Sequence, residues 1–525
     1  MLQTHLTVLE TSASQYSDSP VFKLARSDAQ GHVQSWSTVT YRQFLLDVES
    51  FARHWLSTLS SIGVRPGSVV SLWVGGYTYA KDVLNIYALS RAGFVPQLFS
   101  LRLDSVEVIF ELMHAASSKA LIYDASFKHL LVDCPLPAYL VPESVASTSL
   151  ILPSINPNPD DLAFLFHTSG SSGGSPKLVP CTYRWLDATV TKSKQVCRPH
   201  SASRQDVTVW MGSVAHIGQS FMLIGTLQHG SCVIQPTTIA FSTLELVAMI
   251  QHAGLNRLNQ FAAFLAAHLR AARDDPKLLG LLRGLDEILS SGMALPHEAT
   301  QFAIDNGLKL RIIFGSTEAG ATLTSETGGN PAILEPLDDT AYQFVPVSGD
   351  AEGSHQSTGR LFEFVILDKS ADCPHPSLRS ADGNFHTGDL FLEAAPGRYV
   401  SQGRDDDWIK SSNALRCDTR AIEDNARMMC GNLISECVVV GSGRPSPVLF
   451  VEPAVEMDAE KLKKEIIRKT RAFHTRRYIH ERITSPQMIV VVPPKTLPRT
   501  ATKGNIRRKA VEEAYRAELD GIYAC

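Results

Sequence analysis

Apolar residues near the start of the chain recur in two alternating patterns, one typical of helices and the other of buried strands. Within residues 44–55 they fall every three or four positions, which is the spacing of a single buried helix face. After a Gly-Val-Arg-Pro-Gly turn, the segment 69–74 is short and apolar except for Ser71, as is typical of buried strands. Residues 80–92 and 93–99 repeat the order of helix and strand. This alternation predicts a largely parallel α/β sheet.

Further apolar runs predict strands deeper in the chain. The clearest are 162–166 and 310–314, and glycine and hydroxyl side chains follow closely after each. Another strand is expected over 360–367, whereas the Gly-, Pro-, Asp- and Ser-rich residues 326–360 are expected to form loops. At 525 residues the chain is too long for one ordinary core, so two or more domains are predicted.

The stretch from Phe166 to Leu178, FHTSGSSGGSPKL, carries the first candidate chemistry. Its glycines let the backbone approach an anion, its hydroxyls add hydrogen-bond donors, and Lys177 supplies a positive charge. Composition alone equally allows a solvated Ser/Gly linker. The patterns G-x-x-x-x-G-K-[ST] and G-x-G-x-x-G are both absent from this stretch, so spacing does not decide between a phosphate-holding loop and a linker.

Composition and charge argue against several classes of protein. The charged fraction of 19% and the apolar fraction of 44% are those of a globular protein, and a net charge of -4 without a long basic run argues against nucleic-acid binding. Nine cysteines occur without a CxxC pair, which argues against a zinc site or a disulfide framework and for a reducing compartment. No apolar run approaches the roughly 20 residues that span a bilayer, and no signal-peptide pattern is present. The expected location is the cytoplasm.

Five motifs in collinear order carry a resemblance to a known family. The loop TSGSSGGSPK is similar to the TSGSTGxPK loop of adenylate-forming enzymes, the superfamily of acyl-CoA synthetases, luciferases and the adenylation domains of nonribosomal peptide synthetases. Four later segments resemble motifs that follow in that family: LDEILSSGM (285–293), FGSTE (314–318), HTGD (386–389) and LPRTATKGNIRRK (497–509). The implied fold is a large N-terminal domain of packed α/β subdomains, residues 1–403, and a small mobile α+β C-terminal domain, residues 404–525. A hinge is expected at Asp406.

The resemblance implies a nucleotide site. In the family the glycine-rich loop holds the β- and γ-phosphates of ATP. Phe314 would lie against the adenine, and Asp389 and Arg404 would contact the ribose, whose two hydroxyls suit a carboxylate acceptor. The implied ATP-binding residues are Thr168, Ser169, Gly170, Ser171, Ser172, Gly173, Lys177, Phe314, Gly315, Ser316, Thr317, Asp389 and Arg404.

Four residues are implied to be catalytic. Thr317 would contact the α-phosphate, Glu318 would hold Mg²⁺, and Lys503 would stabilise the developing charge. Without the resemblance, Thr317 and Glu318 would be read as capping residues beside a glycine turn. His216 is the fourth, and alone it would be an ordinary core or cap histidine. The order Lys503-Gly504 is the reverse of the family motif.

The resemblance also places an acyl pocket around His216. Ile217 stands where amino-acid-activating relatives carry an aspartate for the α-ammonium group, and an isoleucine cannot pair with that charge. The predicted substrate is therefore a small carboxylic acid without an α-amine, and an aromatic or medium-chain acid is expected. The implied pocket residues are His216, Ile217, Gly218, Phe221, Ser291, Gly292, Ile313 and Ala321.

The implied activity is that of an AMP-forming carboxylic acid ligase that uses ATP and Mg²⁺. An acyl-adenylate would form first, and its acyl group would pass to a thiol of coenzyme A or of a phosphopantetheine on a carrier protein acting in trans. Transfer to an amine stays open, as does a degenerate member that binds a nucleotide without turnover. The segments GRDDDWIK and CDTRAIEDN resemble adenylating enzymes of fungal secondary metabolism. Nucleic acid and a membrane span are not expected.

Overall fold

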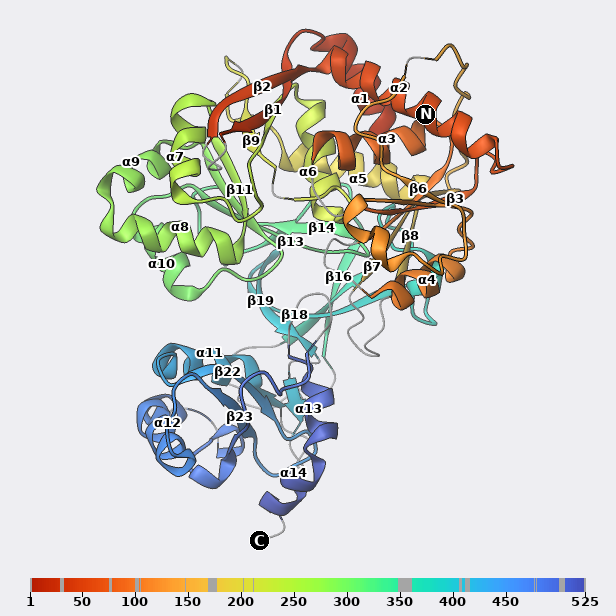
Figure 1. Cartoon of the computed structure of the whole chain (residues 1–525). Helices are drawn as coiled ribbons and strands as arrows, with labels where there is room; N and C mark the ends of the chain where they lie inside the picture. Colours follow the sequence, from red (N-terminus) through yellow and green to blue (C-terminus); the bar gives the residue numbers. More distant parts are fainter. Residues whose placement is uncertain are drawn as a thin grey trace.

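Two large sheets organise the chain before residue 340, as the computed structural model shows (Figure 1). The structure describes residues 2–28, 33–74, 78–99, 103, 105–146, 148–168, 177–201, 203–210, 212–347, 361–405, 408–410, 416–475, 477, 479–499 and 506–523. The nine-stranded sheet has the spatial order β15 (Glu335–Pro336), β14 (Gly320–Thr324), β13 (Leu310–Ser316), β12 (Glu287–Ser291), β11 (Arg257–Phe261), β9 (Val207–Val209), β10 (Cys232–Gln235), β1 (Pro20–Ser27) and β2 (Val33–Thr40). The six-stranded sheet has the order β6 (Ala138–Leu140), β5 (Leu121–Tyr123), β3 (Val69–Trp73), β4 (Val95–Leu98), β7 (Leu162–Thr168) and β8 (Lys177–Thr182).

The nine-stranded sheet is parallel in its interior and antiparallel at both edges, whereas the six-stranded sheet is parallel except at its β8 edge. The strands β9 to β13 pair in parallel, and so do β3, β4, β5 and β7. The turns at β7–β8 and β13–β14 reverse the chain, and both belong to the predicted nucleotide site. The parallel α/β sheet that the early alternation predicts is therefore confirmed.

A layer of helices lies between the two sheets. Its first long helix begins after Thr40, whose side chain accepts a hydrogen bond from the Gln43 N–H, and it buries Phe44, Val48 and Phe51 as the apolar spacing predicts. One hydrophobic core joins these helices to strands of both sheets. The helices are α1 (His5–Gln15), α2 (Tyr41–Ser60), α3 (Leu84–Arg91), which continues a π-helical turn Tyr79–Val83, α5 (Tyr183–Val196) and α6 (Ile217–Gln228).

Other helices cover the outer faces of the sheets. A second core joins four helices to the nine-stranded sheet: α7 (Thr243–His252), α8 (Ala262–Asp274), α9 (Pro276–Gly284) and α10 (His297–Asp305). The helix α4 (Val106–Ala115) packs with Trp73 and Phe99 on the six-stranded sheet.

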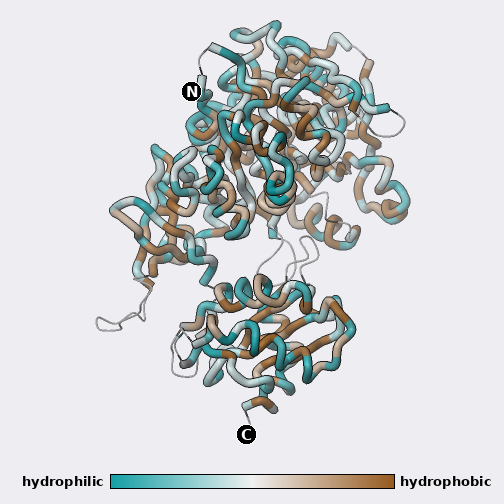
Figure 2. The backbone as a smooth tube through the Cα atoms, turned by 90° about the vertical axis from the view of Figure 1, so that its left-hand side faces the viewer, coloured by the Kyte–Doolittle hydropathy of each residue, from teal (hydrophilic) through white to brown (hydrophobic). Residues whose placement is uncertain are grey.

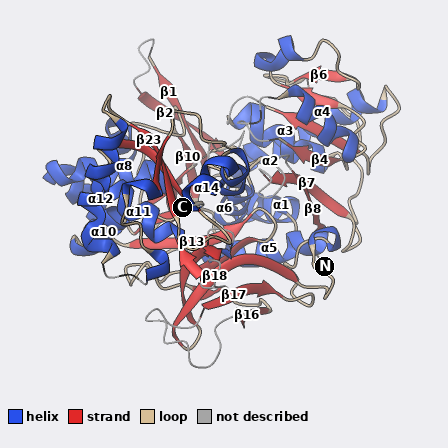
Figure 3. Ribbon diagram, turned by 90° about the horizontal axis from the view of Figure 1, so that it is seen from below, coloured by secondary structure: helices blue, strands red, loops and turns tan. Residues whose placement is uncertain are grey.

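A third sheet of four antiparallel strands lies next to β13 in Figure 3. Its strands are β16 (Tyr342–Pro346), β17 (Leu361–Ile366), β18 (Phe385–Ala395) and β19 (Arg398–Arg404). The prediction that residues 326–360 form loops is wrong for β15 and β16. Phe344 of β16 packs against Phe364, Phe391 and Tyr399, so aromatic packing with distant residues makes this short segment a strand.

The C-terminal part has hydrophobic cores of its own. Each core cluster among the described residues is drawn either from residues up to Tyr399 or from residues from Ile409 onward. Figure 2 shows the C-terminal part below the rest of the chain, with apolar strands in its middle. Its elements are β20 (Trp408–Lys410), β21 (Arg416–Asp418), β22 (Ile434–Val440), β23 (Val448–Pro453), β24 (Ile489–Val491), α11 (Thr419–Cys430), α12 (Ala459–His474), α13 (Arg508–Ala514) and α14 (Arg516–Tyr523). Among the described helices, none is both long and apolar enough to cross a membrane.

Candidate active site

The ends of the predicted phosphate loop lie opposite each other on two antiparallel strands. Thr168 closes β7, Lys177 opens β8, and these two residues are paired in the ladder. Lys177 is exposed. The residues between them, including the predicted ligands Ser169, Gly170, Ser171, Ser172 and Gly173, lie outside the described residues. The strand pairing therefore holds the two ends of the segment together.

The predicted metal ligand Glu318 lies in the tight turn between β13 and β14. Gly315 pairs with Ala321 at this hairpin, and a Cβ at Gly315 would lie 2.3 Å from the Gly320 carbonyl oxygen. Only glycine allows so close an approach of the two strands. The hydroxyl of Ser316 accepts a hydrogen bond from the Ala319 N–H at 3.3 Å, which closes the turn. The Ser316 hydroxyl therefore stabilises the turn in this structure.

Contacts with β8 and α5 place this turn beside the strand and helix that follow the predicted phosphate loop in sequence. The Trp185 indole donates a hydrogen bond to the Glu318 carbonyl oxygen at 3.0 Å, and Trp185 lies in the first turn of α5, directly after β8. Burial raises the pKa of the Cys181 thiol on β8, and the charge of Glu318 raises it further. Glu318 is therefore close to the strand that leaves the predicted loop, and Thr317 precedes it in the same turn.

The predicted ribose and adenine residues lie on neighbouring elements. Asp389 and Arg404 are paired between β18 and β19, and the guanidinium donates to the Asp389 carboxylate at 3.3 Å. The Asp389 side chain is 12% exposed and that of Arg404 is 44% exposed, so the pair is open to solvent on the side of the arginine. Phe314 packs edge-on against Phe391, two residues after Asp389, with 5.2 Å between the ring centroids. The structure thus brings β13 and β18 together.

His216 is an exposed residue at the start of α6. Its Nδ1 accepts a hydrogen bond from the Gly218 N–H at 3.2 Å, so it caps the helix. Its ring also meets the Phe261 ring edge-on at 6.0 Å, and its place in an acyl pocket stays a prediction. Ile217 is buried, at 5% exposure.

Phe261 is a residue that sequence reasoning left unassigned. It ends β11 and directly precedes α8. Gly292 has a φ of +87°, and a Cβ there would lie 3.2 Å from the Phe261 ring. Phe261 therefore lies between His216 and Gly292, two predicted pocket residues, and Ser291 ends the neighbouring strand β12. An aromatic residue that ends a strand in this way is the signal that could have identified it.

Three further predicted pocket residues share one small hydrophobic cluster. Phe221, Ile313 and Ala321 come from α6, β13 and β14. The remaining members are Val196, Cys197, Leu289 and Leu337, with Met222 packed against them. The residues that the sequence assigns to one pocket are therefore neighbours in space, and their surroundings are apolar.

Besides the loop residues, two more predicted residues lie outside the described part of the chain, namely Lys503 and Asp406. Arg499 and Ile506 form an antiparallel bridge on either side of the Lys503 segment. Across the Asp406 position, the Trp408 indole donates a hydrogen bond to the Gln402 carbonyl oxygen at 3.1 Å.

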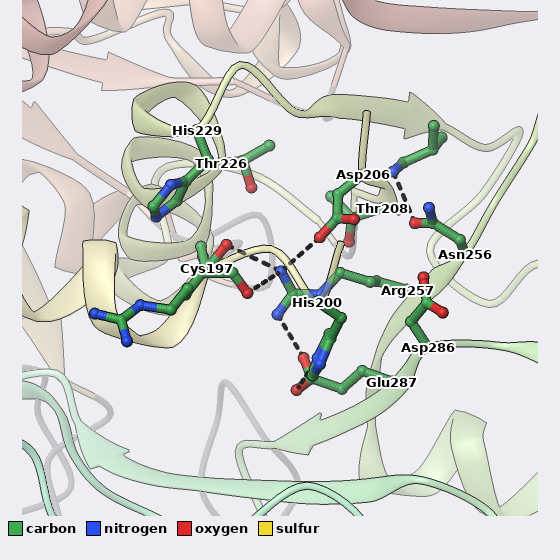
Figure 4. Close-up of polar contacts among 12 residues, drawn as sticks. Cys197, His200, Asp206, Thr208, Thr226, His229, Asn256, Arg257, Asp286 and Glu287 are labelled. Carbon is green, nitrogen blue, oxygen red and sulfur yellow. Dashed lines mark hydrogen bonds and ion pairs between the residues drawn. The ribbon is translucent and has the colours of Figure 1, made fainter. Parts of the chain in front are cut away.

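A cluster of buried charges occupies the opposite ends of the parallel strands (Figure 4). Arg257 begins β11 and Glu287 begins β12, and their side chains are 2.6 Å apart at 5% and 0% exposure. Asp206 lies 3.1 Å from the same guanidinium. Burial alone would raise the pKa of Glu287, but a hydrogen bond from His200 and the charges of Arg257 and Arg311 lower it well below its usual range.

These arginines also bind the C-terminal end of α5. Arg257 donates to the Cys197 carbonyl oxygen at 3.0 Å, and Arg311 donates to the Val196 carbonyl oxygen at 3.0 Å. Cations are favourable at this end of a helix. The cluster fixes α5 against the sheet, and it was missed because its partners are far apart in sequence. Arg and Glu at the first positions of two otherwise buried strands were the available signal.

The described residues would hold Mg²⁺ only together with a bound ligand that supplies further oxygen atoms. No group of three or more His, Cys, Asp or Glu side chains suited to a metal ion occurs among them. Mg²⁺ is commonly held by one or two carboxylates together with phosphate oxygens and water, so a single carboxylate at Glu318 is a suitable donor.

A separate surface cavity of about 520 Å³ is lined by Arg184, Lys369 and Arg379 among others, and by no described residue of the predicted site.

The fold is that of an adenylate-forming enzyme. The chain belongs to the AMP-binding enzyme family: residues 9–355 match the AMP-binding enzyme model, and residues 406–525 match the model of its C-terminal domain. It is an AMP-forming ligase of that family. The chain is 33% identical over 512 residues to the AMP-binding domain-containing enzyme iboA of Amanita muscaria (strain Koide BX008), covering 94% of this chain and 98% of the relative.

Solved structures show the same fold at low identity. O-succinylbenzoate coenzyme A synthetase (MenE) from Bacillus subtilis in complex with AMP superimposes with a TM-score of 0.76 at 16% identity, covering 98% of each chain. The same enzyme is also known in complex with ATP and a magnesium ion, with a TM-score of 0.75 at 17% identity, covering 98% of this chain and 100% of that one. McyG A-PCP complexed with phenylalanyl-adenylate gives a TM-score of 0.74 at 15% identity, covering 99% of this chain and 85% of that one.

Proposed function

We propose that this ligase activates a small carboxylic acid with Mg·ATP and transfers the acyl group to a thiol, either of coenzyme A or of a carrier-protein pantetheine. The observation that carries the proposal is the position of Glu318. Its turn is hydrogen-bonded to Trp185, at the start of the helix that directly follows the predicted phosphate loop and β8. A carboxylate beside such a loop suits a nucleotide bound with a metal ion.

In the first step, a carboxylate oxygen of the acid attacks the α-phosphorus of ATP. A new O–P bond forms, the bond to the bridging oxygen breaks, and pyrophosphate leaves. Bound Mg²⁺ would offset charge on the phosphates. Lys177 and the hydroxyl groups of the loop hold the leaving phosphates, and Thr317 contacts the α-phosphate. Lys503 stabilises the charge that develops there, so catalysis is mainly positioning and electrostatic stabilisation.

The nucleotide and the acid occupy neighbouring parts of the site. Asp389 accepts hydrogen bonds from the ribose hydroxyls with Arg404 beside it, and Phe314 lies against the adenine. The acid enters the apolar pocket around Phe221. Because Ile217 is buried and apolar, an α-ammonium group would have no partner there, which favours an acid without an α-amine.

The second step joins the acyl group to the acceptor. A thiol sulfur attacks the carbonyl carbon, AMP leaves, and the thiol proton is released. The proposal includes a division into residues 1–403 and 404–525, with a hinge at Asp406 that lets the C-terminal domain change place between the steps. The separation of the hydrophobic cores between Tyr399 and Ile409 supports it. Gly403, with a φ of +81°, gives the chain a bend that other residues rarely adopt.

The place in metabolism is also part of the proposal. The similarity to a fungal relative over nearly the whole of both chains supports a role in secondary metabolism. The likeness in fold to McyG A-PCP is in line with a carrier protein as the alternative acceptor, and the cytoplasm is the proposed location.

The test is pyrophosphate release from Mg·ATP across aryl, fatty, keto and amino acids, with and without coenzyme A, and with hydroxylamine to trap the adenylate. Release that a particular acid triggers and coenzyme A accelerates supports the proposal. Release that coenzyme A leaves unchanged indicates a carrier-protein or amine acceptor. If the protein binds ATP but releases no pyrophosphate with any acid, the proposed turnover is refuted. A degenerate member that only binds a nucleotide is then favoured.

Glu318→Gln provides the matched variant. Loss of a carboxylate that holds the metal should lower the rate of adenylation at least about a hundredfold, the scale of removing one main electrostatic contact in an active site. Glu326→Gln, the same change at an exposed residue beyond β14, should leave the rate within about twofold. Equal rates in the two variants would contradict the role of Glu318.

A further inference from the structure

Lys192 is a fully buried lysine on α5 that none of the predicted motifs contains. Its side chain is 2% exposed, and its Nζ lies 2.6 Å from an oxygen of Asp372, which is 1% exposed. The same Nζ donates a hydrogen bond at 2.8 Å to the carbonyl oxygen of Ala319, the residue after Glu318. Burying two charges is costly, so an ion pair in this place calls for a reason beyond packing.

Lys192 acts on the same turn as Trp185. The two residues are seven positions apart on α5, which places them on one face of the helix two turns apart. Trp185 binds the carbonyl oxygen of Glu318 and Lys192 binds that of Ala319. One helix face therefore holds two consecutive peptide carbonyls of the turn that carries the proposed metal ligand.

Asp372 connects this contact to the four-stranded sheet. It accepts hydrogen bonds from the Tyr342 hydroxyl and, at 2.5 Å, from the Ser370 hydroxyl. Burial would raise the pKa of Asp372, but the charge of Lys192 and the hydrogen bonds from Lys192, Ser370 and Tyr342 lower it. Three ammonium hydrogens let Lys192 bind the turn and Asp372 at once, which a neutral apolar side chain cannot do.

The far end of α5 is fixed independently. Arg257 and Arg311 bind its last carbonyl oxygens from the sheet. These arginines restrain the helix at one end, and β8, which leads directly into it, restrains the helix at the other end. A helix held in this way cannot move so as to release the turn.

We propose that Lys192 is a positioning residue of the adenylation site: through the Ala319 carbonyl oxygen, and together with Trp185, it fixes the Glu318 carboxylate where the metal–phosphate group of ATP binds. This inference rests on the proposed function, since it assumes that Glu318 serves the metal. Lys192 itself does not touch the substrate. Its effect should therefore appear in the part of ATP binding that depends on metal.

The experiment separates this role from simple stabilisation with two variants. Lys192→Met removes the ammonium but leaves Asp372 buried without a charge partner, so it should lower the thermal midpoint. Lys192→Met combined with Asp372→Asn removes both charges at nearly constant shape and should recover most of that midpoint. The double variant still lacks the bond to the Ala319 carbonyl oxygen, so stability and positioning are separated. Asp372→Asn alone, which keeps that bond, is the control.

Calorimetry of ATP binding provides the readout, in Mg²⁺ and in EDTA. We expect the double variant to bind ATP about tenfold more weakly than wild type in Mg²⁺ and equally well in EDTA, as befits the loss of one hydrogen bond at the metal turn. The magnesium concentration for half-maximal adenylation should rise by a similar factor. Trp185→Phe, which removes the other donor, should act in the same direction, and Asp372→Asn should stay near wild type in both media.

Either of two results would overturn the inference: wild-type binding in Mg²⁺ by the double variant, or an equal loss in both media. The binding arm does not require turnover. A wild-type protein that binds Mg·ATP but adenylates no acid therefore refutes the proposed function, while the comparison of wild type with the double variant still decides the role of Lys192.

Discussion

Acid should destabilise this protein through His5, a histidine buried on its first helix. His5 is 2% exposed, and neither ring nitrogen has a hydrogen-bond partner among the described residues. Its ring meets Tyr87 edge-on at 4.8 Å between centroids and lies 4.9 Å from the Phe164 ring. Burial lowers the pKa of His5 from 6.5 to about 3, because this apolar place accepts only the neutral imidazole.

The sign and size of the effect follow from this difference in pKa. As the pH falls through about 6.5 the unfolded chain takes up a proton at His5, whereas the folded protein does so only near pH 3. The contribution of His5 to stability is therefore complete above pH 6.5 and is lost as the pH falls. At pH 5, about 1.5 units below the unfolded pKa, the loss is about 2 kcal/mol.

Urea unfolding of wild type and His5→Leu at pH 7.5 and pH 5 measures this loss. Leucine has a similar volume and takes up no proton, so the difference in unfolding free energy should shift by about 2 kcal/mol in favour of the variant on acidification. Steric effects of the substitution are the same at both pH values and cancel. His129→Leu, at an exposed position, should show no such shift. If His5→Leu keeps the wild-type pH dependence, the reasoning about a neutral buried imidazole is refuted.

Two further predictions concern the site. Gly315→Ala places a Cβ 2.3 Å from the Gly320 carbonyl oxygen, so the hairpin that carries Glu318 must open, and adenylation should fall at least about tenfold with a lower thermal midpoint. Gly280→Ala, in α9 with nothing within 4 Å of the new Cβ, is the control and should be neutral or slightly stabilising. Equal adenylation activities of the Gly315→Ala and Gly280→Ala variants would contradict the packing argument. Phe261→Ala should raise the KM for the acid about tenfold and leave the KM for ATP unchanged, as loss of a half-buried ring from the proposed acyl pocket requires. An effect confined to ATP would remove Phe261 from the pocket.

Local patterns were enough to predict the elements that carry their own signals. The helix that starts after Thr40 has a capping hydroxyl and a regular apolar face, so its position depends on residues close in sequence. The strand Tyr342–Pro346 depends instead on aromatic partners as distant as Tyr399. Its prediction as a loop failed because polar and proline residues around it dominated the local pattern, while the packing that decides its structure is non-local.

The same limit of local sequence patterns applies more strongly to the candidate active site. The residue types at Glu318, Asp389 and Arg404 were visible as motifs, and the structure places the last two in one ion pair. The hydrogen bond from Trp185 to the Glu318 carbonyl oxygen spans 133 positions, and the pair Lys192–Asp372 spans 180. Neither contact has a local pattern, because a buried lysine in a helix looks like any surface lysine until its neighbours are known.

These long-range contacts suggest why α5 matters to the site as much as the motif residues do. A motif supplies the chemical groups, but a carboxylate in a three-residue turn can adopt many positions unless the backbone of the turn is fixed. Hydrogen bonds to peptide carbonyls fix the backbone without occupying the side chain, so Glu318 stays available to a ligand. Because the donors come from the helix that β8 leads into, the phosphate-loop end and the carboxylate keep a constant separation. Positions preset in this way spare the protein the cost of ordering them during the reaction.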